Sequence, residues 1–337
     1  MTDVVPARGS LRSRGAAAVS AYTLRPITAA IPPERAWGIW MSRRIIARIM
    51  GTLGPSLAGT RVEQVDARLP DGRRVKGEWV SGPRTPASET PRAIGTGAGA
   101  IYYVHGSGYA VCSAKTHRRL TSWLSSLTGL PVFCVDYRLA PRHRFPTAAD
   151  DVRAGWDWLL QAREVSPKQL VIAGDSAGGH LSVDLLLQPE VAANHPAAMV
   201  LFSPLYDITF ELSLARERVR PDPAARAADA LRLVRLYHGD IDPTHHRLTL
   251  DVAGGPPLPP TLIQAGGAEM LQEDARQLAA DIQTAGGRCE LQIWPHQVHV
   301  FQALPRMTPE AAKAMAYVAR FIAHTLQDAR VLADEAG

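Results

Sequence analysis

A single serine, Ser176, stands among small residues in the segment GDSAGGH, residues 174–180. The apolar residues before it are typical of the end of a buried strand, and those after it, up to Leu187, of a helix. A serine on such a sharp turn, flanked by Gly174 and Gly178, matches the G-x-S-x-G nucleophile elbow. Glycine tolerates the close backbone approach, and N–H groups at a helix start can stabilise a developing negative charge. The segment predicts a catalytic nucleophile, and a plain serine N-cap in a tight turn is the alternative.

Two histidines, His296 and His299, follow the strand-like segment ELQIW late in the chain. A nucleophilic serine needs a base that takes its proton. His296 lies nearer the predicted strand end, where simple solvation would account for it. We therefore predict His299 as the base.

Three carboxylates follow the predicted strand TLIQAG, in the segment AGGAEMLQEDARQ. Glu269 lies near the strand tip, whereas Glu273 and Asp274 lie at the predicted start of the next helix. Acidic residues at a helix start have a sufficient role as capping or dipole partners. Glu269 is thus the candidate for the acid that orients the histidine and stabilises its cation.

Small residues also follow an earlier apolar strand, in the segment YYVHGSGYA. His105, Gly106, Ser107 and Gly108 occupy the position at which α/β-hydrolases place the second donor of an oxyanion hole. Glycines in such a loop allow backbone amides to turn toward a substrate oxygen.

From about residue 100 onward, strand-like segments alternate with helical ones. This alternation predicts a mostly parallel sheet with helices on both faces. Before it, two strands are expected around a turn at residues 70–72, followed by a surface loop over residues 82–100.

Two stretches do not fit this alternation. Residues 35–53 have apolar residues at helical spacing, and residues 208–250 look helical and then irregular. We expect residues 1–58 to form a helical cap or lid segment, and residues 59–330 to form the catalytic domain with a cap excursion at about 208–250. Core packing and membrane contact are the alternatives for the helix at 35–53.

The composition narrows the class of protein. The 337 residues are 46% hydrophobic and 20% charged, which suits one large globular domain or a domain with an attached cap. The net charge of +5 comes with scattered arginines, and no basic run is interleaved with aromatic residues, so we expect no nucleic-acid partner. The sequence has no stretch of 18 apolar residues, so we expect no transmembrane helix.

Three cysteines are present: Cys112, Cys134 and Cys289. Their odd number and wide spacing argue against a disulfide framework or a zinc site. Cys134 is expected in the core, and the pattern favours a reducing compartment, so we predict a cytoplasmic protein. The pair His245 and His246 is assigned to a solvated loop, and neither a metal nor an organic cofactor is expected.

Together these segments resemble the hormone-sensitive-lipase-like family of α/β-hydrolase carboxylesterases. The resemblance spans about residues 100–325, and its carriers are HGSG at 105–108, DYRLAPRHRFPTAADD at 136–151, GDSAGGH at 174–180, SPLYD at 203–207 and VHVF around His299. It implies the α/β-hydrolase fold, with a mostly parallel central sheet flanked by helices and a helical cap.

The resemblance also implies site residues. Ser176, Glu269 and His299 would be the catalytic triad. Backbone amides of the oxyanion hole would come from Gly106, Ser107, Gly108 and Ala177. Three positions depart from the usual family pattern: Ser107 replaces the middle glycine of HGGG, Arg142 replaces the acid of LAPE, and Glu269 stands where Asp is common.

The implied activity is hydrolysis of carboxylic esters with short to medium acyl chains through an acyl-enzyme. The expected partner is a small-molecule ester, while transient contact with a membrane surface and a homodimer are left open. Two other classes are weighed against the enzyme. One is a catalytically silent small-molecule receptor on the same fold, and the other is a membrane-surface lipid-binding protein that uses Trp37, Trp40 and the arginines around them.

Overall fold

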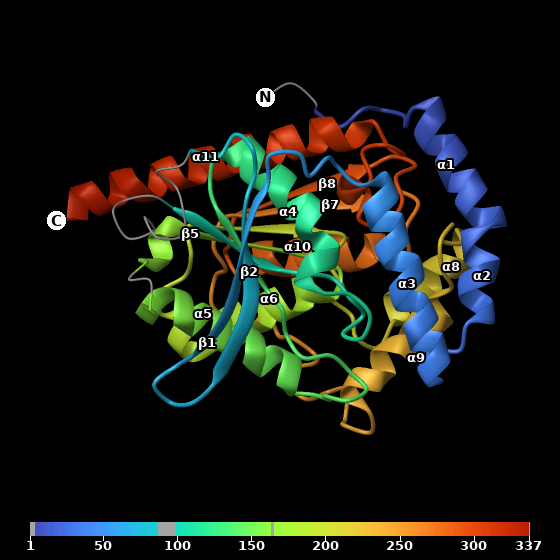
Figure 1. The fold of residues 1–337 in the computed structure, drawn as a ribbon, viewed down its shortest axis with the longest axis horizontal. Coiled ribbons are helices and arrows are strands. Elements are labelled where there is room, and N and C mark those ends of the chain that lie inside the picture. Colours follow the sequence, from blue (N-terminus) through green and yellow to red (C-terminus); the bar gives the residue numbers. More distant parts are fainter. Residues whose placement is uncertain (1–3, 87–98, 163–164, 337) are drawn as a thin grey trace.

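The computed structural model describes residues 4–86, 99–162 and 165–336. Figure 1 shows a central sheet with helices packed on both of its faces and a group of helices beyond one end of it. Of the loop predicted over residues 82–100, residues 87–98 lie outside the described ranges.

Eight strands of the described chain form one sheet in the order β1-β2-β4-β3-β5-β6-β7-β8. The hairpin predicted around residues 70–72 is confirmed, because β1 and β2 pair antiparallel. Strand β2 is also antiparallel to β4, and every later pair is parallel. The strands are β1 (Arg61–Arg68), β2 (Arg74–Ser81), β3 (Ala100–Val104), β4 (Val132–Val135), β5 (Leu170–Asp175), β6 (Ala198–Phe202), β7 (Thr261–Gly266) and β8 (Cys289–Trp294).

Two layers of helices cover the sheet, as the alternating pattern predicted. One face packs against α4 (Ala114–Thr128) and α11 (Glu310–Ala336), and the other against α5 (Thr147–Ala162), α6 (Ala177–Leu187) and α10 (Gln272–Thr284). Cys134 of β4 is fully buried between the sheet and the first of these layers, which confirms its expected place in the core. Short turns complete the domain: η2 (Pro167–Gln169), α7 (Pro189–Ala192) and η3 (Phe301–Ala303).

The remaining helices lie together at the right-hand end of the molecule in Figure 1. They are α1 (Leu11–Tyr22), α2 (Leu24–Ala30), α3 (Ala36–Leu53), α8 (Glu211–Val219) and α9 (Ala227–His238). The helix predicted over residues 35–53 is therefore confirmed as α3. Arg25 of α2 forms an ion pair with Glu217 of α8 at 2.7 Å, and Arg232 of α9 forms one with Glu34 at 2.6 Å. Residues 1–58 and residues 208–250 therefore contact each other through these two ion pairs.

Candidate active site

Ser176 lies on the turn between β5 and α6, at the carboxyl end of the sheet. Its φ and ψ are +51° and −124°, a region in which a residue with a side chain is strained. Glycine is required at residues 178 and 179 because any Cβ there would collide with a neighbour. A Cβ on Gly178 would lie 2.0 Å from the Val104 carbonyl oxygen, and one on Gly179 would lie 2.8 Å from Cβ of Pro204. The start of α6 can approach the sheet only because these side chains are absent.

Glu269 and His299 meet at the same edge of the sheet. Glu269 follows the end of β7 by three residues and is fully buried, and its Oε2 lies 2.5 Å from Nδ1 of His299. Its other carboxylate oxygen accepts the N–H of Gly266 at 2.6 Å. Burial lowers the pKa of His299, but the hydrogen bond to Glu269 and its charge outweigh burial, so that the pKa lies above its ordinary value. The imidazole side chain keeps 34% of its surface exposed.

The alternative residues have other partners. His296 accepts the N–H of Gly9 through Nδ1 at 3.3 Å, and Glu273 forms an ion pair with Arg216 at 3.4 Å. Asp274 is fully buried, and its Oδ1 accepts the backbone N–H groups of Tyr206 and Asp207 at 3.0 and 2.9 Å.

Asp274 lies in the first turn of α10, as predicted, and its carboxylate has a further role. Its side chain turns inward to satisfy two amides of the loop after β6, and no side chain caps α10 at Leu271. Burial raises the pKa of Asp274 to about 7, against the pull of the two amides.

The loop after β3 carries the predicted oxyanion donors. Gly106 donates its N–H to Oδ1 of Asp175 at 2.9 Å, so this amide is committed inside the protein, and Gly106 is corrected from an oxyanion donor to an anchor of the loop. Gly108 has φ of +50°, and a Cβ there would lie 2.7 Å from Cδ2 of Leu233 in α9. Ala177 is the first residue of α6, where an N–H has no acceptor within the helix.

Ser107, which stands where the family usually has glycine, uses its hydroxyl. Its Oγ lies 2.7 Å from the Tyr137 hydroxyl, which in turn donates to the carbonyl oxygen of His105 at 2.6 Å. Because the tyrosine has one proton to give, Ser107 is the donor in the first bond. Serine in place of glycine at position 107 therefore adds a hydrogen bond that holds the loop after β3 against Tyr137.

Asp175 is a positioning residue that the sequence reasoning missed. It is 2% exposed and binds Gly106 N–H, the Tyr103 hydroxyl at 2.7 Å and Nε2 of His117 at 3.3 Å. Burial raises the pKa of Asp175, but the charge of His117 and these hydrogen bonds outweigh it and lower the pKa; the pKa of His117 is raised in turn. A carboxylate that ends an otherwise apolar strand, directly before the serine, is the signal that could have shown this.

Two residues of the 208–250 excursion, also missed, hold the loop that carries Glu269. Arg216 of α8 donates from Nε to the Glu269 carbonyl oxygen at 2.8 Å and from Nη2 to that of Gly267 at 2.9 Å. Asp222, 2% exposed, accepts the N–H of Met270 at 2.8 Å. Their signal in the sequence is weak, because charged residues are common in such a stretch.

The described residues contain no group of three or more His, Cys, Asp or Glu that could hold a metal ion. The rings of His245 and His246 stack at 4.5 Å. Within the described ranges, no helix has the length and the apolar character needed to span a membrane.

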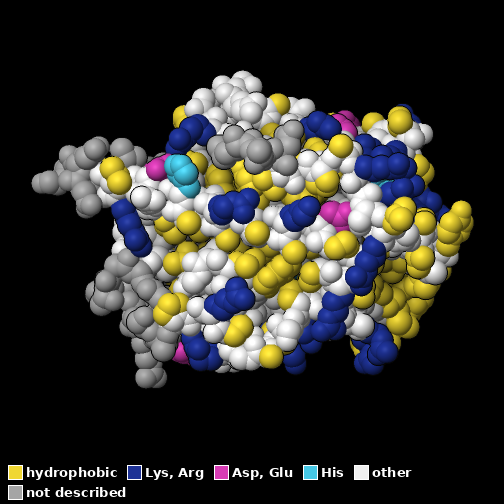
Figure 2. Space-filling view, turned by 90° about the horizontal axis from the view of Figure 1, so that it is seen from above, with side chains coloured by type: hydrophobic (Ala, Val, Ile, Leu, Met, Phe, Trp, Pro, Cys, Tyr) yellow, Lys and Arg dark blue, Asp and Glu magenta, His cyan; other side chains and the backbone are white. Residues whose placement is uncertain are grey.

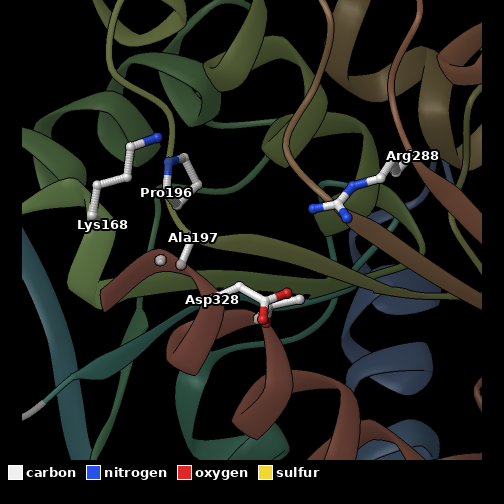
Figure 3. Close-up of a pocket in the computed structure, with 7 residues that line it drawn as sticks. Lys168, Pro196, Ala197, Arg288 and Asp328 are labelled. Atoms are coloured by element: carbon white, nitrogen blue, oxygen red, sulfur yellow. The ribbon is translucent and has the colours of Figure 1, made fainter. Parts of the chain in front are cut away.

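One cavity, of about 250 Å³, lies away from this site (Figure 3). Lys168 precedes β5, Pro196 and Ala197 precede β6, and Arg288 precedes β8, so it opens at the amino ends of the strands, with Asp328 of α11 on its far wall. Ser176, Glu269 and His299 lie beyond the opposite, carboxyl ends. In parallel α/β sheets ligands bind at those carboxyl ends, so this cavity is not part of the candidate active site.

Comparison with known proteins places the chain in a family. A family model described as an alpha/beta hydrolase fold matches residues 101–303. Esterase LipU of Mycobacterium tuberculosis (strain ATCC 25618 / H37Rv) is 37% identical over 246 residues, which cover 70% of this chain and 79% of LipU.

Solved structures agree in fold. An esterase from the bacterial hormone-sensitive lipase family is 29% identical, with a TM-score of 0.76 over 94% of this chain and 97% of that one. EstE5, in a crystal soaked with p-nitrophenyl butyrate, is 28% identical, with a TM-score of 0.79 over 94% of this chain and 99% of that one. The fold class expected from the sequence is thereby confirmed, and the chain belongs to the hormone-sensitive-lipase-like esterases of the α/β-hydrolase fold, as a carboxylic ester hydrolase.

Proposed function

We propose that this chain hydrolyses esters by a serine mechanism. His299 takes the proton of the Ser176 hydroxyl through Nε2, and the serine oxygen attacks the ester carbonyl carbon. Collapse of the tetrahedral intermediate breaks the bond to the alcohol, which leaves with the proton held by His299. Water, activated by the same histidine, then attacks the acyl-enzyme, releases the carboxylic acid and restores Ser176.

The observation that carries the proposal is the 2.5 Å bond between Glu269 and His299. With Nδ1 protonated and bound to the carboxylate, Nε2 is the basic nitrogen. A fully buried carboxylate costs stability unless it is paired. Such a pair is expected in an enzyme that forms an imidazolium during catalysis and has no evident purpose in a catalytically silent receptor.

The oxyanion would be bound by the backbone amides of Ser107, Gly108 and Ala177. Removing one such donor costs on the order of 10²- to 10³-fold in kcat in well-studied sites. Support comes from the anchoring of this loop by Asp175 and Tyr137, which fixes the amides before substrate arrives.

Short to medium acyl chains are the proposed substrates, covered by a cap built from residues 1–58 and 208–250. Leu233 of α9 lies directly over Gly108, and the helices of the excursion are short, which limits the room above the loop. That a related structure was soaked with p-nitrophenyl butyrate supports the same range. A series of p-nitrophenyl esters from acetate to palmitate tests it, and a maximum at palmitate would overturn it.

A reducing compartment, the cytoplasm, is the proposed location. Cys112, Cys134 and Cys289 are all free thiols, and the first two are buried. Free cysteines are typical of compartments that keep thiols reduced.

The serine mechanism is tested by a fluorophosphonate probe, which reacts with activated serines. Wild-type protein should gain the mass of one phosphonyl group on Ser176, and Ser176→Ala should gain none. Absence of labelling in folded wild-type protein, or equal labelling of the variant, would refute the mechanism.

A further inference from the structure

The positive charge of the chain is concentrated in its first 58 residues. This segment has eight arginines, no lysine and two acidic residues. The rest of the chain has 29 basic and 30 acidic residues, so the segment accounts for the whole positive net charge. Of its two acids, Glu34 is already paired with Arg232 of α9.

The same segment exposes large apolar side chains. Trp37 and Trp40 of α3 each keep 54% of their surface exposed, and Tyr22 of α1 keeps 86%. The full set on α1–α3 is Leu11, Val19, Tyr22, Ile27, Trp37, Trp40 and Met41. Figure 2 shows hydrophobic side chains gathered at the right-hand end of the molecule, where these helices lie in Figure 1, beside a line of Lys and Arg.

Helix α3 places apolar and basic side chains on one exposed face. The exposed side chains at positions 37, 40, 41, 44 and 48 follow the i, i+3, i+4, i+7, i+11 pattern of one helix face; they are Trp37, Trp40, Met41, Arg44 and Arg48. The other face, including Ile46 and Ile49, packs against the catalytic domain. The guanidinium of Arg44 lies 4.9 Å from the ring centre of Trp40.

We propose that this exposed face of α1–α3, which we call the cap face, binds the surface of an anionic phospholipid bilayer. Tryptophan and tyrosine favour the boundary between water and hydrocarbon. Arginine can lay its stem along apolar groups while its head stays among lipid phosphates. Together they give the combination by which interfacial helices bind membranes, apolar burial plus attraction to anionic lipid.

A second copy of the chain is a poorer occupant of the cap face. In a two-fold contact the same surface meets itself, so two positively charged surfaces would be brought together. Helices α1–α3 have no acidic side chain to pair with the arginines, and Glu34, which lies just before α3, is held by Arg232. A bilayer with negative headgroups removes this repulsion.

Docking by the cap face would bring the lipid surface close to the candidate active site. Arg43 of α3 donates from Nε and Nη2 to the carbonyl oxygen of Ala110 at 3.0 and 2.8 Å, only two residues after Gly108. A cavity of about 390 Å³ lies between α3 and residues 140–142, and Trp40 is one of its walls. Docking itself does not depend on the proposed chemistry.

The test is co-sedimentation of the full-length protein with vesicles of phosphatidylcholine alone and of equal parts phosphatidylcholine and phosphatidylglycerol. Binding is expected only to the anionic vesicles and should weaken as salt is raised. Arg44→Gln/Arg48→Gln should reduce the partition coefficient by about five-fold for each arginine removed. Trp37→Ser/Trp40→Ser should also reduce it, whereas Val62→Ser/Val331→Ser, two exposed valines elsewhere, should not.

Circular dichroism and thermal melting establish that each variant is folded, and Ser176→Ala should bind vesicles as wild type does, which separates docking from catalysis. Equal binding to neutral vesicles, or unchanged binding of the folded tryptophan and arginine variants, would overturn the proposal. A dimer in light scattering that becomes monomeric only in Trp37→Ser/Trp40→Ser would assign the cap face to a second copy instead.

Discussion

The two segments of the proposed cap, residues 208–250 and 1–58, are attached in different ways. The 208–250 segment holds the loop that carries Glu269, which we call the acid loop, through largely buried groups. Arg216 binds two carbonyl oxygens of this loop, and Asp222 binds one of its amides. Residues 1–58 meet that segment through two ion pairs. The side chains of Arg232 and Glu34 are 41% and 46% exposed, and those of Arg25 and Glu217 are 28% and 17% exposed. Buried hydrogen bonds to a loop fix its geometry, whereas exposed ion pairs add little stability. The first part thus positions chemistry, and the second offers a surface.

The largest effect should come from the acid that the 208–250 segment holds in place. Glu269→Gln leaves a group of the same size but removes the charge that favours the correct tautomer and the imidazolium of His299. We expect kcat on p-nitrophenyl butyrate to fall by about two to four orders of magnitude, with the fold retained. Glu273→Gln, on a half-exposed neighbour, is the control and should stay near wild type.

The same pair sets the pH dependence. His299 acts as a base only when neutral, so kcat/KM should fall at acid pH with an apparent pKa above the ordinary histidine value, in line with its raised pKa. Loss of the Glu269 charge should move this acid limb to lower pH. An acid limb that stays in place in Glu269→Gln would show that another group titrates.

A smaller effect should follow from loosening the acid loop. Arg216→Met removes the donors to the carbonyl oxygens of Gly267 and Glu269, and we expect kcat to fall about ten-fold, since misplacement of a catalytic group costs rate steeply. The acid limb should also shift to lower pH as the bond from Glu269 to His299 weakens. Unchanged kcat and unchanged pH profile would remove the contrast between the two parts of the cap.

Asp274→Asn should affect stability and leave kcat unchanged. Burial raises the pKa of Asp274 to about 7, above the ordinary value for an aspartate, so the protonated side chain stabilises the fold at acid pH and this contribution is lost as pH rises through 7. The variant should flatten the change in the free energy of unfolding across that range, measured by urea titration at several pH values. A crippled kcat with an intact fold would instead make Asp274 the catalytic acid.

The smallest effect should come from the ion pair between the two parts of the cap. Arg232→Met removes the exposed bond to Glu34, and we expect about 0.2–1 kcal/mol of lost stability with kcat unchanged. It is the matched control for Arg216→Met, since both remove one arginine of the 208–250 segment. A kcat loss as large as that of Arg216→Met would mean that the contact with residues 1–58 also holds the active site.

Much of this architecture could be predicted from local patterns. Alternating apolar segments gave the parallel sheet, and the glycines around Ser176 indicated a tight strand-to-helix turn, because periodicity and backbone sterics act over a few residues. The bonds from Asp175 to Gly106 and from Asp274 to Tyr206 join residues 69 and 68 positions apart. The position of Asp175 at the end of an apolar strand is a local signal, but the partners of both carboxylates are set by the folded geometry. The commitment of the Gly106 amide and the inward bonds of Asp274 therefore could not be predicted.

The central claim is that one serine on the strained turn carries the chemistry. It is tested most directly by kcat of Ser176→Ala on p-nitrophenyl butyrate, with circular dichroism showing that the fold is kept. We predict a loss of at least about 10⁴-fold, by analogy with triad serines elsewhere. Turnover close to that of wild type in the folded variant would contradict the account.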